Sequence, residues 1–268
     1  MIQSKNNFMK IFINVDNYKK EALETAGELK KLASKYKIKL VDDSSKADMI
    51  FSVGGDGTFL KAARLSDRVP IIGINCGTLG FLTEINPEDL DNTIKSILDG
   101  EYYIEDRMML EGEIIKENGE IIKIPPALNE IALSKNTFGV VRFDAIVDDK
   151  LINSYTADGI LVSTPTGSTA YNLSCGGPIA DPTANIITLT PIAPHTILNR
   201  SIVFSDTSII TINITELRQN TKSVVLYDGL PIEVTTGDIV KIRKSDVITK
   251  IIKLNWRSFI DTIRENIK

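Results

Sequence analysis

The stretch Val53-Gly54-Gly55-Asp56-Gly57-Thr58 decides how the first part of this chain folds. It follows an apolar run at residues 47–53 that is typical of a short buried strand, and it precedes a helix-like run at residues 59–65. A glycine-rich turn that opens a helix presents backbone N–H groups and the positive end of the helix dipole, and both favour phosphate. Asp56 is unusual in such a cradle, because a carboxylate repels phosphate unless it holds a metal ion or accepts a proton. The combination indicates phosphoryl transfer rather than passive nucleotide binding.

The first hundred residues alternate between strand-like and helix-like segments. Strands are predicted at 10–15, 38–41, 47–53 and 69–74, and helices at about 22–36, 59–65 and 87–99, with Asn86 as the N-cap of the last. This alternation predicts a doubly wound, Rossmann-like α/β domain over residues 1–104, with ligands at the carboxyl ends of its parallel strands.

From residue 105 the pattern changes to short β-rich runs separated by turn residues. Asn118-Gly119 lies between two isoleucine-rich runs and predicts a hairpin, because both residues tolerate positive φ. Further strands are predicted around 127–135, 140–147, 208–214, 223–227 and 238–243. We therefore expect an all-β, sandwich-like domain over residues 105–246. The segment 247–268 is apolar and then amphipathic, and we expect it to pack back on the first domain.

Composition excludes several classes of protein. The chain has 268 residues, is 43% hydrophobic and carries a net charge of −4, whereas a nonspecific nucleic-acid binder would be basic. Its two cysteines, Cys76 and Cys175, give no disulfide framework and no zinc-ligand spacing, which favours a reducing cytoplasm. We expect no membrane span, because no run of about 18 apolar residues occurs. The first residues have no apolar core of signal-peptide length behind them.

A second candidate site is the uncharged segment 164–178, which is dense in hydroxyl groups and glycine. Such a segment offers neutral donors and acceptors to a sugar and a phosphate, although a turn followed by a helix N-cap is the alternative. Asp158-Gly159 lies just before it. A carboxylate there can accept hydrogen bonds from ribose hydroxyls or an amide, or it can be a simple turn residue.

The third element is Asn129-Glu130 inside the strand-like run 127–133. Two adjacent polar residues in an apolar strand place one of them on the buried face. Burial without a partner costs about 1–3 kcal/mol, and a ligand with hydroxyl groups would supply partners. An edge strand that exposes Glu130 to water is the alternative.

In order and spacing these segments resemble the NAD kinase family, over nearly the whole chain. The resemblance rests on Gly54-Gly55-Asp56-Gly57-Thr58, Asn129-Glu130, Asp158-Gly159 and the segment 163–171, supported by Gly73 to Phe81 and by Pro191 to His195. The glycine–aspartate loop alone also occurs in diacylglycerol and sphingosine kinases, and phosphofructokinases have a related one. The Thr-Pro-Thr-Gly-Ser-Thr-Ala-Tyr segment together with Asn-Glu is much more specific.

The resemblance implies phosphoryl transfer from ATP or polyphosphate to the 2′-hydroxyl of the adenosine ribose of NAD, giving NADP, with Mg²⁺ offsetting charge on the donor. It implies that Asp56 is the proton acceptor and that Gly54, Gly55, Gly57 and Thr58 contact the donor's phosphates. The NAD-binding residues that it implies are Asp56, Gly57, Lys61, Phe81, Asn129, Glu130, Asp158, Thr169, Ala170, Tyr171, Asn172, Leu173, Ser174 and Ala193. A solvated helix face is the alternative for Lys61, and a core position is the alternative for Phe81.

The sequence departs from the family pattern at Thr156, where many relatives carry a basic residue, and at Leu230, where many carry glutamine after Asp-Gly. One competing hypothesis is a lipid kinase that shares the loop, but it would need an apolar acyl-chain cleft, whereas the segment 164–178 is polar. The other is a non-catalytic dinucleotide sensor, but binding alone would be easier without the negative charge of Asp56. Bacterial relatives are commonly homodimers or homotetramers, so the resemblance also implies a homo-oligomer.

Overall fold

The chain forms two compact units in a computed structural model that describes residues 9–77, 80–217, 223–254 and 258–266. The first unit comprises Met1–Asp106 with Thr249–Lys268, and the second comprises Arg107–Ile248. The chain therefore passes from one unit to the other at residues 106–107 and again at residues 248–249. Thr78 and Leu79 of the family-like segment, the N-terminal residues 1–8, and residues 255–257 and 267–268 of the C-terminal segment lie outside the described residues.

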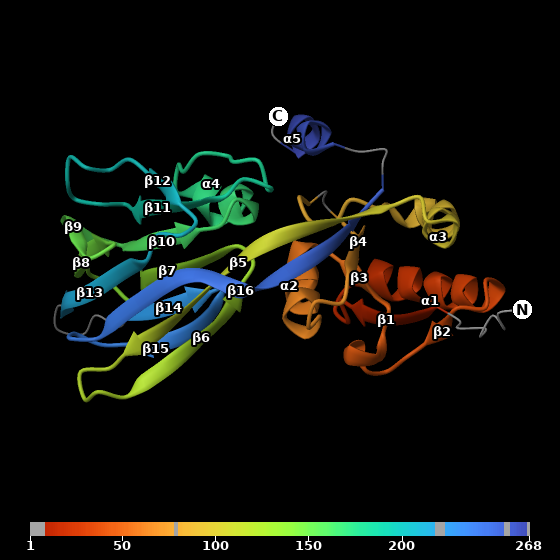
Figure 1. The fold of residues 1–268 in the computed structure, drawn as a ribbon, viewed down its shortest axis with the longest axis horizontal. Coiled ribbons are helices and arrows are strands. Elements are labelled where there is room, and N and C mark those ends of the chain that lie inside the picture. Colours follow the sequence, from red (N-terminus) through yellow and green to blue (C-terminus); the bar gives the residue numbers. More distant parts are fainter. Residues whose placement is uncertain (1–8, 78–79, 218–222, 255–257, 267–268) are drawn as a thin grey trace, which may run out of the picture. The chain divides into compact units, whose positions relative to one another are not determined.

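The first unit is an α/β fold, as predicted from the alternating pattern. Its elements, with η for 3₁₀ turns, are β1 (Lys10–Val15), α1 (Lys20–Lys35), β2 (Lys39–Leu40), η1 (Ser44–Lys46), β3 (Met49–Gly54), α2 (Asp56–Leu65), β4 (Ile71–Asn75), η2 (Pro87–Asp89), α3 (Leu90–Asp99) and α5 (Phe259–Asn266). The strands run parallel in the order β2-β1-β3-β4 (Figure 1). Ile251, near the end of β16 (Ile239–Lys253), pairs in parallel with Ile71 of β4.

Apolar spacing assembles this unit. α1 buries Ala22, Ala26 and Leu29, which recur at intervals of three and four residues on one helix face. β3 and β4 are buried along their whole length, as expected for parallel strands that are covered on both faces. The predicted helix at 87–99 instead begins as the turn η2 before α3, and the Asn86 side chain makes no capping hydrogen bond. Proline at the first position of η2 has a fixed φ that suits this start without a side-chain cap.

The strand order reverses between β1 and β3, because β2 lies on one side of β1 whereas β3 and β4 lie on the other. At such a switch point, the loops at the carboxyl ends of the two strands diverge and leave a crevice for a ligand. Here those loops are residues 16–19 after β1 and the glycine turn after β3. The topology thus places the glycine-rich stretch where parallel sheets bind ligands.

The second unit is a sandwich of antiparallel sheets. Its elements are the greater part of β5 (Tyr103–Ile115), then β6 (Ile121–Ala127), β7 (Glu130–Lys135), β8 (Val141–Val147), β9 (Lys150–Ala157), β10 (Gly159–Ser163), η3 (Thr166–Thr169), α4 (Tyr171–Ser174), β11 (Ile186–Ile192), β12 (Ile202–Ser205), β13 (Ile210–Leu217), β14 (Ser223–Tyr227), β15 (Leu230–Val234) and most of β16. One sheet has the order β12-β11-β10-β7-β14-β15 (Figure 1). The other has the order β16-β13-β8-β9, and β5 pairs with both β16 and β6.

The core of the second unit lies between these sheets. Phe143 of β8 and Ile212 of β13 meet Leu133 of β7 and Val162 of β10 in one buried cluster. β8 alternates strictly between buried and half-buried residues, so one of its faces points into the core. The predicted hairpin is confirmed, because β5 pairs with β6 across Asn118-Gly119 and Gly119 adopts φ +87°. No helix among the described residues is long and apolar enough to cross a membrane.

Candidate functional site

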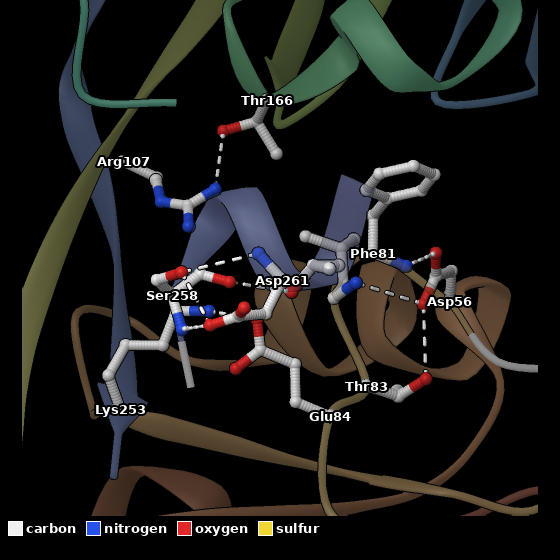
Figure 2. A network of polar contacts seen from close by, with 11 residues as sticks. Asp56, Phe81, Thr83, Glu84, Arg107, Thr166, Lys253, Ser258 and Asp261 are labelled. Carbon is white, nitrogen blue, oxygen red and sulfur yellow. Dashed lines mark hydrogen bonds and ion pairs between the residues drawn. The ribbon is translucent and has the colours of Figure 1, made fainter. Parts of the chain in front are cut away.

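Asp56 is the first residue of α2, and its carboxylate is fixed by the segment that follows β4. Its Oδ2 accepts the Phe81 backbone N–H at 2.9 Å. Its Oδ1 accepts the Leu82 N–H and the Thr83 hydroxyl, each at 3.2 Å (Figure 2). A carboxylate has about four lone-pair sites, and these contacts use three of them. The side chain is therefore held in one orientation with acceptor capacity left on Oδ2.

Gly80 lies against this carboxylate. A Cβ atom added at Gly80 would be 2.1 Å from Asp56 Oδ1 and 2.6 Å from Asp56 Cγ. Both distances are far below a van der Waals contact, so a larger residue at position 80 would displace the acid. The sequence places Gly80 in the family-like segment, but only the structure shows that it makes room for Asp56.

A hollow of about 390 Å³ lies over the glycine turn, at the switch point of the sheet. The residues that line it are Val15, Asp16, Asn17, Tyr18, Lys19, Gly55, Gly57, Thr58 and Lys61. Lys61 is exposed on α2, and Lys19 reaches the rim, where its Nζ donates to the Cys76 carbonyl at 3.3 Å. Two ammonium groups and the positive end of the α2 dipole make this hollow suited to a polyanion.

The second predicted site is built around the backbone of residues 128–130 in the second unit. Thr164 donates its N–H to the Asn129 carbonyl at 2.9 Å and its hydroxyl to the Leu128 carbonyl at 2.6 Å. The Asp228 carboxylate accepts the N–H groups of Leu128 and Asn129 at 2.9 and 2.8 Å. Gly167 packs so closely that an added Cβ would lie 2.1 Å from the Asn129 carbonyl oxygen. The structure thus brings Asn129-Glu130 and the segment 164–178 into direct contact.

Glu130 is buried, and the edge-strand alternative for it is wrong. β7 lies between β10 and β14 in its sheet, and Glu130 is only 9% exposed. Its Oε2 is buried and has no hydrogen-bond partner among the residues that the structure describes. The pKa of Glu130 is raised to about 7, mainly by burial and also by the nearby Asp228 carboxylate. A hydrogen bond from the Tyr171 backbone lowers this pKa and offsets part of the rise. A buried acceptor of this kind is suited to a ligand hydroxyl group.

The segment 164–178 forms η3 and then the single turn α4. The Thr164 hydroxyl accepts the Gly167 N–H at 3.0 Å, which is a side-chain cap on the start of η3, so the alternative of a turn followed by a helix N-cap describes this part of the segment. The predicted NAD contacts Thr169, Ala170 and Leu173 are half-buried, whereas Tyr171 and Ser174 are exposed. Asn172 differs from these, because it is fully buried and bonds to the Thr190 hydroxyl and the Pro178 carbonyl.

Asp158 forms an ion pair with Lys135 of β7, with 2.6 Å between its Oδ1 and Lys135 Nζ. Both side chains are about one-third exposed, so the pair lies at the surface of the unit. The cation beside Asp158 therefore comes from the neighbouring strand β7. It does not come from position 156, where this chain has threonine in place of the basic residue of many relatives. Sequence reasoning missed Lys135, because only the sheet register brings β7 beside the start of β10.

Phe81 and Ala193 are the remaining predicted site residues, and His195 ends the family-like segment 191–195. Phe81 is half-buried, and its backbone N–H is the group that contacts Asp56. Ala193 is exposed after β11 with φ +43°, a conformation that is uncommon for alanine. His195 is exposed, and its N–H donates to the Thr156 carbonyl.

Four residues that hold the two sites were not predicted from the sequence as site residues. They are Lys19 and Thr83 in the first unit and Lys135 and Asp228 in the second. Asp228-Gly229 was noted only as the Asp-Gly of the family pattern that precedes Leu230, and the other three residues carried no signal. Each acts on a residue distant in sequence, so no local pattern reveals it.

The chain matches the ATP-NAD kinase N-terminal domain family over residues 4–102 and the ATP-NAD kinase C-terminal domain family over residues 128–254. It is 42% identical over 227 residues to an NAD kinase of Caldanaerobacter subterraneus subsp. tengcongensis, covering 83% of this chain and 79% of that one. The chain belongs to the NAD kinase family. A further NAD kinase, from Thermoanaerobacter sp. strain X514, is 40% identical and covers 87% of this chain and 82% of its own length.

Two solved structures of NAD(H) kinases share the fold. The yeast NADH kinase, complexed with NADH, superposes with a TM-score of 0.83 at 23% identity, covering 98% of this chain and 88% of that one. The NAD kinase of Archaeoglobus fulgidus, in complex with ATP, superposes with a TM-score of 0.77 at 24% identity, covering 96% of this chain and 98% of that one. The predicted combination of an α/β domain with a β-sandwich domain is therefore confirmed as the fold of this family.

Proposed function

We propose that this chain transfers the terminal phosphoryl group of ATP to the 2′-hydroxyl of the adenosine ribose of NAD, giving NADP and ADP. The observation that carries the proposal is the carboxylate of Asp56, fixed by three donors at the start of α2 beside a hollow lined by two lysines. A site that only binds phosphate would be better without this charge. Membership of the NAD kinase family and the NADH and ATP named for its structural neighbours support the choice of substrates.

In the proposed reaction, the ribose oxygen forms a bond to the terminal phosphorus while the bond from that phosphorus to the bridging oxygen breaks. The proton of the ribose hydroxyl passes to the Asp56 carboxylate, and ADP leaves with the electron pair of the broken bond. Lys61, Lys19 and the backbone of Gly55 and Gly57 are proposed to bind the donor's phosphates. Asn129 and Glu130 are proposed to hold ribose hydroxyls.

Mg²⁺ is proposed as the divalent cation of this reaction. Among the described residues, no group of three histidine, cysteine, aspartate or glutamate side chains is placed to hold a metal ion. This arrangement fits a cation that keeps most of its waters and is carried on the donor's phosphates, as Mg²⁺ usually is. Asp16, which lines the hollow, is the residue that would hold it. When bound, Mg²⁺ offsets negative charge on the phosphates.

The test of the proposal is direct. The purified chain is incubated with ATP, Mg²⁺ and NAD, and NADP is measured with an NADP-specific dehydrogenase. Parallel reactions replace ATP with inorganic polyphosphate, replace NAD with NADH, or add a chelator, which should stop the reaction. Absence of NADP with every donor would exclude the proposed function, and phosphorylation of a diacylglycerol in its place would favour the lipid kinase.

Substitution of Gly80 by alanine should impair catalysis through Asp56. Because the new Cβ would overlap the Asp56 carboxylate, we expect kcat to fall roughly tenfold or more, since misplacement of a reacting group by about 1 Å is costly. The KM for NAD should change much less. Steady-state kinetics test this, and a kcat equal to that of the unmodified chain would show that Asp56 does not need the space at Gly80.

The wider setting of the chain is also a proposal. We propose a cytoplasmic homodimer or homotetramer, on the resemblance to bacterial relatives and on a strand-rich second unit that offers sheet edges for pairing. Size-exclusion chromatography with light scattering tests the oligomeric state.

A further inference from the structure

Asp228 lies in the two-residue turn between β14 and β15. Tyr227 pairs with Leu230 across the turn, and Asp228 and Gly229 have φ values of +45° and +80°. Positive φ at both central residues is the geometry of a tight hairpin that follows the strand twist. Asparagine or glycine at the first position would form the same turn, so the turn itself does not require a carboxylate.

The carboxylate reaches instead to the start of β7. One oxygen accepts the Leu128 N–H and the other accepts the Asn129 N–H, at 2.9 and 2.8 Å. The backbone N–H of Asp228 donates to the Glu130 carbonyl at 3.1 Å. Three hydrogen bonds from one residue therefore hold three consecutive residues that lie about a hundred positions away in the sequence.

Thr164 holds the same two residues through their carbonyls, by donating to the carbonyl oxygens of Leu128 and Asn129. With Asp228 on the N–H groups and Thr164 on the carbonyls, the backbone that carries Asn129 and Glu130 is fixed on both sides. We propose that Asp228 is a positioning residue for NAD, acting through the backbone of residues 128–130 to aim the Asn129 and Glu130 side chains. This inference rests on the proposed function, because it assigns Asn129 and Glu130 to the ribose.

Asp228 also acts on Glu130 through charge. The titratable groups that face the Glu130 carboxyl are Asp228 from the β14–β15 turn and Tyr171 and Cys175 from α4 and its end. Of these, Asp228 is the one that contributes a full negative charge and so raises the pKa of Glu130. Removal of that charge lowers this pKa, so Glu130 would ionise at lower pH.

The test compares Asp228→Asn and Asp228→Ala with the unmodified chain. Asparagine keeps one acceptor oxygen and loses the charge, whereas alanine loses both hydrogen bonds. We expect the KM for NAD to rise about tenfold in Asp228→Ala and by less in Asp228→Asn, with the KM for ATP unchanged. If ionised Glu130 accepts from the ribose, the KM for NAD falls as pH rises through about 7, and this transition moves to lower pH in Asp228→Asn.

Asp148→Asn is the matched control. Asp148 also has positive φ, +48°, in a hairpin turn of the same unit. Its carboxylate also accepts from a distant segment, from the Ile209 backbone N–H and the Ser208 side-chain hydroxyl. It touches none of residues 128–130 in these contacts. We expect Asp148→Asn to lower the melting temperature as much as Asp228→Asn does while leaving the KM for NAD and its pH dependence unchanged.

Calorimetric binding of NAD without ATP separates this inference from the proposed function. If the unmodified chain makes no NADP but binds NAD, the proposed function fails, and weaker binding by the Asp228 variants still supports positioning. If the unmodified chain makes NADP and Asp228→Asn shows an unchanged KM and pH profile, positioning by Asp228 is wrong. Equal changes in Asp228→Asn and Asp148→Asn would likewise overturn it.

Discussion

Replacement of Asp56 by asparagine should lower kcat by about 10²–10⁴-fold, the range that general base catalysis contributes. NAD binding, measured by calorimetry, should stay within a few-fold of that of the unmodified chain. The physical reason is that a carboxamide is nearly isosteric with the carboxylate but accepts no proton. The substituted side chain also turns its NH₂ group toward one of the three donors, so stability should fall by about 1–2 kcal/mol.

Thermal unfolding separates these two effects. Asp89→Asn is a suitable control, because Asp89 lies at the N-terminus of α3 in the same unit and its side chain makes no capping hydrogen bond. This control should change neither kcat nor the melting temperature appreciably. Equal loss of turnover and of NAD affinity in Asp56→Asn would show that Asp56 binds the substrate and is not the proton acceptor.

Substitution of Gly167 by alanine should impair both stability and NAD binding. The added Cβ would lie 2.1 Å from the Asn129 carbonyl oxygen and 2.8 Å from its Cα, and this backbone is held by Thr164 and Asp228. Because backbone fixed on both sides cannot move aside, we expect a loss of about 1–3 kcal/mol in the free energy of unfolding. Displacing both Asn129 and Glu130 should weaken NAD binding about 100-fold, at about tenfold per lost hydrogen bond.

Gly27→Ala is a control that should change the free energy of unfolding in the opposite direction to Gly167→Ala. Gly27 lies within α1, and nothing is found within 4 Å of a Cβ added there. Alanine should therefore raise the stability by about 0.5–1 kcal/mol and leave the kinetics unchanged. Chemical denaturation and the KM for NAD measure both variants. If Gly167→Ala and Gly27→Ala had the same stability and the same KM for NAD, the close approach of Gly167 to Asn129 would not restrict the residue at position 167. The proposed fixed geometry would then be wrong.

Most of the fold was predictable because its signals are local. Apolar residues at helical spacing predicted α1. The alternation of helix-like segments with short apolar runs predicted the parallel sheet of the first unit. Asn118-Gly119 gave the β5–β6 hairpin through its turn chemistry. One error was at an element end, at Pro87, where a 3₁₀ turn precedes α3, because the first turn of a helix depends on its neighbours. Four strands of the second unit, β9, β11, β12 and β15, were not predicted.

The candidate site was predictable only in part. The sequence pointed to Asp56 and to Asn129-Glu130 by residue types that are unexpected in a phosphate cradle and in an apolar strand. It did not indicate Thr83 beside Asp56, Lys135 beside Asp158 or Lys19 at the hollow. It also left Glu130 open to an edge position, which only the order of strands around β7 excludes.

The sequence by itself determined the two kinds of domain, the glycine–aspartate turn and the identity of the acid proposed for catalysis. These depend on composition and periodicity over a few residues, which the chain encodes locally. Only the tertiary structure decided what holds each acid: three donors after β4 around Asp56, and Asp228 with Thr164 around the segment that carries Glu130. Such contacts join residues up to about a hundred positions apart, and strand order and register, set by packing of the whole core, bring them together.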